Sequence, residues 1–263
     1  AYQVLGYSFS KNFPVGADGS IKLPPHIKSF FDDLAAQMES AIDGGTDSAM
    51  TVKRSNSRRI KGSLPVSVDP LITTTWDQGQ YYNSQCPEDF NGPDGHVWAG
   101  CVATAMAQIV KYWGTPTYGR GTHGYDSNYG RLEVNFEASN LDYTQMPNEL
   151  TSGCSEAQVN AVATLMYQCG VACNMAYGTE ESSSYDIDAR AGLINFFRFS
   201  PDMSFAEKEF FTDDDWNGLL RENLAANHPI IYSGQSNSGG HSFICDGYKA
   251  DDYFHFNFGW GGF

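Results

Sequence analysis

Apolar residues recur at two different spacings along this chain. In five stretches between residues 24 and 228 they follow the spacing of amphipathic helices, and from residue 229 onward short apolar runs are separated by glycine, aspartate and asparagine. The first spacing predicts helices over 24–42, 101–113, 155–170, 185–199 and 212–228. The second predicts strands over 229–235, 240–250 and 252–260. Helices followed by an antiparallel sheet indicate an α+β fold.

The helix that begins at Cys101 carries an apolar stripe from Val102 to Trp113. Gly100 and a loop precede it, so Cys101 lies in the first turn, where free backbone N–H groups and the helix dipole favour a thiolate. A thiolate there is a nucleophile, and the same N–H groups can bind an oxyanion. The alternative is a small buried cysteine without chemistry, and the helix alone leaves both interpretations open.

Among six histidines, His241 stands at the start of an apolar strand, directly after two glycines. In the next strand, His255 and Asn257 share one face. If the two strands form a hairpin, Asn257 returns beside His241, where an amide carbonyl orients the imidazole. His241 is therefore the expected base for the thiol, and His255 is its competitor.

The order and spacing of these residues point the same way. His241 follows Cys101 by 140 residues, and Asn257 follows it by 156. A cysteine near the start of a domain, with histidine and asparagine at about these distances, is typical of papain-type peptidases.

Charge and cysteine content exclude several other classes of protein. The 263-residue chain has a net charge of −15, which disfavours nucleic acid and anionic lipid as partners. It contains no apolar run long enough to insert into a membrane. Its six cysteines are irregularly spaced, and Cys169 and Cys173 lack the second pair that a zinc site needs. We expect neither a metal nor another cofactor.

The N-terminal region differs from the rest of the chain. It holds a predicted strand over 2–9 and the helix over 24–42, whose apolar stripe is too large to be covered by so short a segment. The stretch 43–62 is small and polar and carries five of the sixteen basic residues. It is an exposed linker, and the alternatives for it are a plain connector or a site of proteolytic cleavage.

Four stretches together resemble the streptopain/interpain family of bacterial papain-like cysteine peptidases, which are made as zymogens. They are "WDQGQYYN" (76–83), "GCVATAMAQIVKYW" (100–113), "GGHSFICDG" (239–247) and "HFNFGWGG" (255–262). The resemblance implies a papain-like fold, with a helical subdomain carrying the cysteine and a sheet subdomain carrying histidine and asparagine. It divides the chain into part of a small α/β prodomain with its activation linker, 1–60, and a catalytic domain, 61–263, whose C-terminal end is expected to be truncated.

The resemblance also implies roles for the motif residues. Cys101 becomes the nucleophile, His241 the general base and acid, and Asn257 the residue that orients the imidazole. Gln78 becomes the side chain that helps to bind the oxyanion, with Gln80 as the neighbouring alternative.

Two further positions are expected to bind substrate. Gly240 is expected to contact the substrate backbone, and Trp260 is expected to form a wall of the site. Phe258 departs from the family pattern, which commonly has tryptophan directly after the asparagine.

The function implied is that of a secreted cysteine endopeptidase zymogen that cleaves proteins or peptides. Its prodomain is expected to block the cleft as an intramolecular inhibitor until the linker is cut, and its location is expected to be extracellular, at the cell surface or in the periplasm of a bacterium. Two alternatives use the same fold. One is an acyltransferase that passes the acyl group to an amine, and the other is an inactive binding homologue.

Overall fold

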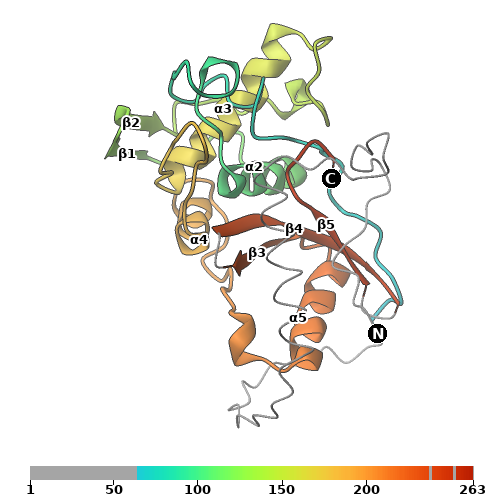
Figure 1. Ribbon diagram of the computed structural model, residues 1–263. Coiled ribbons are helices and arrows are strands. Elements are labelled where there is room, and N and C mark those ends of the chain that lie inside the picture. The colour runs from blue at the N-terminus through green and yellow to red at the C-terminus, as the bar shows by residue number, and fades with distance from the viewer. Residues whose placement is uncertain (1–63, 237–238, 251–252, 263) are drawn as a thin grey trace, which may run out of the picture.

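The computed structural model describes residues 64–236, 239–250 and 253–262 (Figure 1). The predicted strand over 2–9, the helix over 24–42 and the basic linker over 43–62 all lie outside these residues. The described part contains four α-helices, five strands and three short 3-10 helices. The α-helices are α2 (Cys101–Trp113), α3 (Glu156–Ala172), α4 (Asp186–Asn195) and α5 (Asp213–Ala225). The 3-10 helices are η1 (Pro93–Gly95), η2 (Tyr143–Gln145) and η3 (Lys208–Phe210).

The C-terminal strands form one antiparallel sheet in the order β3, β4, β5, as the alternating pattern predicts. They are β3 (Ile230–Ser236), β4 (Gly239–Lys249) and β5 (Tyr253–Asn257). Figure 1 shows α2, α3 and α4 on one side of this sheet and α5 on the other. Alternation along β4 supplies both interfaces: Ile244 packs on the α2 side, and Cys245 packs on the α5 side. The α+β class is confirmed.

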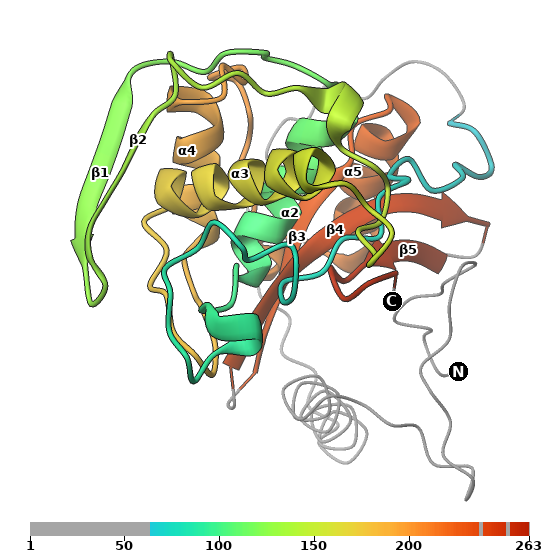
Figure 2. The ribbon, with the colours of Figure 1, turned by 90° about the horizontal axis from the view of Figure 1, so that it is seen from above.

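Helix α2 is the central helix of the molecule. Every residue from Val102 to Val110 is buried, including Thr104 and Gln108. Figure 2 shows α3 lying across α2, with the sheet on the far side of α2. The single apolar stripe predicted for this helix is therefore too narrow, and its last member, Trp113, is 43% exposed.

The predicted helix ends differ from the observed ones by a few residues. Ser155 caps α3 as expected, and it forms a reciprocal capping box with Gln158. The helix then continues past Gly170 to Ala172, and the missing side chain at Gly170 makes room for the hydroxyl of Tyr177. Here glycine allows close packing and does not end the helix.

One pair of strands was not expected from the sequence. Strands β1 (Thr122–Ser127) and β2 (Gly130–Asn135) form a two-stranded antiparallel ribbon at one side of the helical half (Figure 2). Leu132 and Val134 bury one face of it, while polar residues and glycine obscure the alternation. Among the described residues, no helix has the length and hydropathy required to cross a membrane.

Candidate active site

Cys101 is the first residue of α2, and the backbone before it is held in an unusual conformation. Gly100 has φ +92°, and a Cβ at that position would lie 2.7 Å from Cε of Met175. Only glycine fits both the torsion and the space. On the preceding side, the N–H of Ala99 donates to the carbonyl of Gln78 at 2.9 Å. The packing of Met175 against Gly100 and the hydrogen bond between Ala99 and Gln78 thus hold the start of α2 in place.

Two opposing effects act on the Cys101 thiol. Burial raises its pKa above the ordinary value, and the negative charge of Asp186 acts in the same direction. The backbone N–H groups of Ser242 and Val102 lie against the sulfur and lower the pKa. Burial outweighs them, so the helix terminus alone does not produce the low pKa that the sequence suggests. The thiol needs a base.

His241 lies on β4 and is 8% exposed. Its ring stacks on Trp260 with the centroids 4.2 Å apart and the planes inclined by 22°. Its Nε2 lies 2.8 Å from the backbone oxygen of Phe258. A carbonyl oxygen only accepts, so we assign the ring proton to Nε2 and the accepting lone pair to Nδ1. In the neutral ring, Nδ1 is therefore the nitrogen that can accept a proton.

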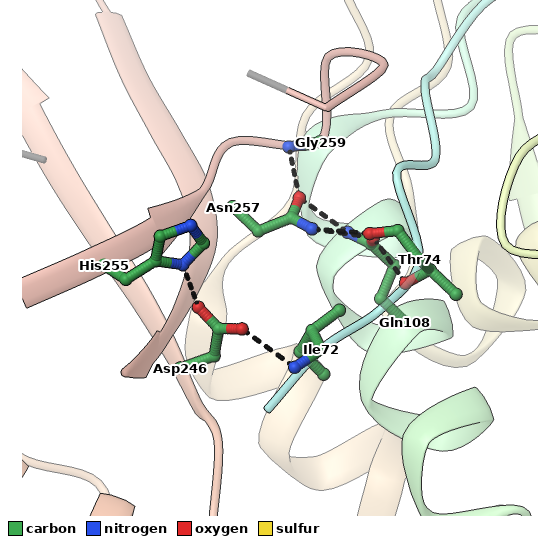
Figure 3. Close-up of polar contacts among 7 residues, drawn as sticks. All are labelled: Ile72, Thr74, Gln108, Asp246, His255, Asn257 and Gly259. Atoms are coloured by element: carbon green, nitrogen blue, oxygen red, sulfur yellow. Dashed lines mark hydrogen bonds and ion pairs between the residues drawn. The ribbon is translucent and has the colours of Figure 1, made fainter. Parts of the chain in front are cut away.

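Asn257 has partners other than the imidazole (Figure 3). Its Nδ2 donates to the carbonyl of Thr74 at 2.7 Å, and its amide pairs reciprocally with the amide of Gln108 at 3.2 and 3.3 Å. Its Oδ1 accepts from the N–H of Gly259 at 3.1 Å. These contacts anchor the turn after β5 to α2 and to the segment before it, and the role of Asn257 in orienting the imidazole stays a prediction.

Strand register explains why the carbonyl of Phe258 reaches the His241 ring. Asn257 pairs with Ile244, whereas His241 pairs with Gly234 on the opposite neighbour, β3. The hairpin therefore returns Asn257 three residues away from His241. The chain then turns, and the carbonyl of Phe258 reaches the ring.

The competing base, His255, belongs to a separate cluster. Its Nδ1 lies 2.5 Å from Oδ1 of the fully buried Asp246, whose Oδ2 accepts from the backbone N–H of Ile72 at 2.8 Å (Figure 3). His255 thus helps to hold the segment around Ile72 against β4. This arrangement supports the choice of His241.

The two candidate glutamines occupy different environments. Gln78 is half-buried, and its carbonyl is bonded to Ala99, two residues before the thiol. Gln80 is exposed, and its Nε2 lies 3.4 Å from Oδ1 of Asp94. The contact with Ala99 places Gln78 next to the nucleophile in space.

A cleft of about 1840 Å³ opens beside Cys101 and His241. Gly240 lines it and is exposed, as a residue that contacts a substrate backbone must be. Tyr185 and Asp186 line it from the first turn of α4. Within the described ranges, no group of three or more histidine, cysteine or acidic side chains could bind a metal ion.

Residues 76–263 match the model of the Peptidase C10 family. The chain belongs to this family. It is 27% identical over 271 residues to the thiol protease/hemagglutinin PrtT of Porphyromonas gingivalis, and 27% identical over 287 residues to streptopain of Streptococcus pyogenes. Both alignments cover 99% of this chain, but the chain spans only 30% of PrtT and 66% of streptopain.

Solved structures confirm the papain-like fold. A prointerpain A fragment of Prevotella intermedia matches with a TM-score of 0.77 and 30% identity, over 95% of this chain and 76% of that one. Active interpain A, a cysteine protease of the same organism, matches with a TM-score of 0.71 and 35% identity, over 76% of this chain and 84% of that one. The resemblance that the four sequence motifs indicate is thus confirmed.

Proposed function

We propose that this C10 family member is a cysteine endopeptidase that hydrolyses peptide bonds in proteins. The observation that carries the proposal is the arrangement of one cleft. Cys101 lies at the N-terminus of a buried helix, and His241 is held by the Phe258 carbonyl with Nδ1 as its accepting nitrogen. PrtT is named a thiol protease and interpain A a cysteine protease, and both names support the same chemistry.

The residues divide the reaction between them. His241 Nδ1 takes the proton of the Cys101 thiol, and the thiolate attacks the substrate carbonyl. The backbone N–H of Cys101 and the side chain of Gln78 stabilise the oxyanion. His241 then protonates the leaving amine and, as a base, activates the water that releases the acyl group. Trp260 covers the imidazole face, and Gly240 contacts the substrate backbone.

The N-terminal region fits a propeptide in this scheme. The prointerpain fragment aligns with 95% of this chain, whereas active interpain A aligns with 76%. Residues 1–60 act as an intramolecular inhibitor that is released by cleavage in the basic linker. The protein acts outside the bacterial cytoplasm on protein substrates.

Replacing the nucleophile tests the activity. Cys101→Ala should lower peptide hydrolysis at least about 10³-fold, because the oxyanion site alone retains little catalysis. The matched control is Cys154→Ala, which removes another half-buried thiol and should leave the rate unchanged. A peptidyl epoxide should label Cys101, and only while His241 is present. Full activity in Cys101→Ala would overturn the proposal.

The same variant reports on the propeptide. Mass spectrometry of active wild-type protein should show loss of about the first 60 residues, whereas Cys101→Ala should keep them if processing is autocatalytic. Fully active enzyme that retains residues 1–60 would contradict the inhibitory role.

A further inference from the structure

A carboxylate that lines the cleft connects the helical half of the molecule to the sheet. Asp186 is the first residue of α4, and each of its oxygens accepts one serine hydroxyl from the sheet. Oδ2 accepts from Ser233 on β3 at 2.5 Å, and Oδ1 accepts from Ser242 on β4 at 2.7 Å. These serines are directly opposite one another in the β3–β4 register. One side chain thus binds a cross-strand pair from the facing helix.

Asp186 does more than begin a helix. The N-cap of α4 is Tyr185, which makes no side-chain cap, and the Asp186 carboxylate extends to the strands. An acidic residue in a first turn is favoured by the helix dipole. Here that favourable position also places the charge against the sheet and beside Cys101, and all three elements line the cleft.

Ser242 is the link between this carboxylate and the nucleophile. Its hydroxyl donates to Asp186, its backbone N–H lies against the Cys101 sulfur, and the residue before it is His241. Ser242 is 6% exposed, so few other arrangements are open to it. A change in the Asp186 contact is therefore transmitted to both members of the catalytic pair.

We propose that Asp186 is a positioning residue for the catalytic pair. By holding the Ser242 and Ser233 hydroxyls, its carboxylate ties the start of α4 to β3 and β4. Through Ser242, whose backbone N–H lies against the Cys101 sulfur, it sets the approach of His241 to Cys101. The inference rests on the proposed peptidase chemistry and adds a residue that acts through Ser242 without touching the reacting atoms.

Electrostatics gives this role a measurable signature. The Asp186 charge raises the pKa of the Cys101 thiol. The other ionisable groups around the thiol are His241 on β4 and the Cys173 thiol at the end of α3. Removing the Asp186 charge therefore moves the thiol toward the thiolate, while removing its hydrogen bonds loosens Ser242. Loss of the hydrogen bonds should therefore lower kcat, whereas loss of the charge should lower the pH midpoint of Cys101 alkylation.

The test compares three variants. Asp186→Asn keeps the shape and one acceptor, but it removes the charge. Ser242→Ala removes the hydrogen bond and keeps the charge. Asp188→Asn removes one charge from the same turn of α4 and serves as the matched control. For each, kcat, KM and thermal stability are measured, together with the pH dependence of Cys101 alkylation by iodoacetamide, mapped by mass spectrometry.

Asp186→Asn should lower kcat about tenfold with less than about twofold change in KM, because a misplaced reacting group costs rate more than binding. It should also lower the alkylation midpoint, because the Asp186 charge raises the pKa of the thiol. Ser242→Ala should lower kcat similarly without lowering the midpoint. Asp188→Asn should change neither.

Two results would overturn the inference. One is an Asp186→Asn variant that matches Asp188→Asn in both kcat and midpoint. The other is an Asp186→Asn variant in which thermal stability and kcat fall but the pH midpoint of Cys101 alkylation is unchanged. That pattern is expected of a purely structural residue. Alkylation does not require turnover, so it reports on Asp186 even if Cys101→Ala were to show that the peptidase proposal itself is wrong.

Discussion

At the scale of single residues, the site depends on a backbone carbonyl. The His241 ring is held by the Phe258 oxygen and by stacking on Trp260, and Asn257 supports this turn by accepting from Gly259. An aromatic residue at position 258 leaves that carbonyl unchanged. The departure of Phe258 from the family pattern therefore keeps the contact that fixes the imidazole tautomer.

The raised pKa of Cys101 predicts how the thiol behaves without its base. In His241→Ala, burial keeps the thiol protonated, so iodoacetamide should alkylate Cys101 slowly at pH 7. The rate should rise with pH through a midpoint above the ordinary thiol value of 9.0. The wild-type protein should react at least about tenfold faster at pH 7, because its imidazole accepts the proton.

Replacement of an exposed histidine provides the control. His228→Ala should react at the wild-type rate. Equal rates at pH 7 for His241→Ala and the wild type would show that the helix terminus suffices to ionise the thiol, which the burial of Cys101 argues against.

At the scale of elements, the site depends on how α2 begins. Gly100 has φ +92°, and its missing side chain admits Met175 and the carbonyl of Ser182. Gly114 ends the same helix with φ +60° and open space around the position of a Cβ. Both glycines have a positive φ, but Gly114 is in the left-handed helical region with ψ 25°, whereas Gly100 has ψ 142° and a crowded Cβ position.

Gly100→Ala should destabilise the protein by about 3 kcal/mol or more, because strain at positive φ adds to a backbone and side-chain clash. Activity should fall as well, since Cys101 is the next residue. Gly114→Ala should cost only about 1 kcal/mol and leave kcat unchanged. Chemical denaturation and kinetics measure both effects. A similar loss for the two variants would mean that the crowding and the ψ angle of Gly100 add nothing to the ordinary cost of a positive φ.

The elements also show how far the sequence can be interpreted. Periodicity predicts α2 and the sheet, because a long buried helix or strand requires regularly spaced apolar residues. Cys101 lies at the start of its helix and His241 near the start of its strand, as predicted. Periodicity does not predict the β1–β2 ribbon, where Gly124 and polar residues interrupt the alternation. It does not reveal the contact between His241 and the carbonyl of Phe258, because strand register and the course of the turn after β5 depend on the folded backbone. Asp186 gives no sequence signal, since an acidic first turn has an ordinary explanation.

At the scale of the whole molecule, a buried polar network joins the segment before α2, α2 itself and the sheet. Thr74, Gln108 and Asn257 connect all three, and Asp246 binds the backbone of Ile72 (Figure 3). The same close packing buries many thiols and phenols. Burial raises the pKa of Cys86 and Cys173 to about 12, and it raises the pKa values of Cys169 and Cys245 in the same direction.

This burial predicts a loss of stability in alkali. Below about pH 9 these thiols are protonated in both the folded and the unfolded protein, so they do not make stability depend on pH. Between about pH 9 and 12 the unfolded chain releases their protons and the folded chain keeps them. Each such group should then lower the free energy of unfolding by about 1.4 kcal/mol per pH unit.

Urea denaturation of Cys101→Ala protein, which excludes self-digestion, at pH 8 to 11 measures this slope. Adding Cys86→Ala removes one titrating group and should make the slope shallower by that group's share, whatever its effect on stability at pH 8. Cys86 is the suitable choice because it lies far in sequence from the sheet, within the core of the helical half. A slope unchanged by Cys86→Ala would mean that this thiol ionises equally in both states, and that the helical core admits water at high pH before the molecule unfolds.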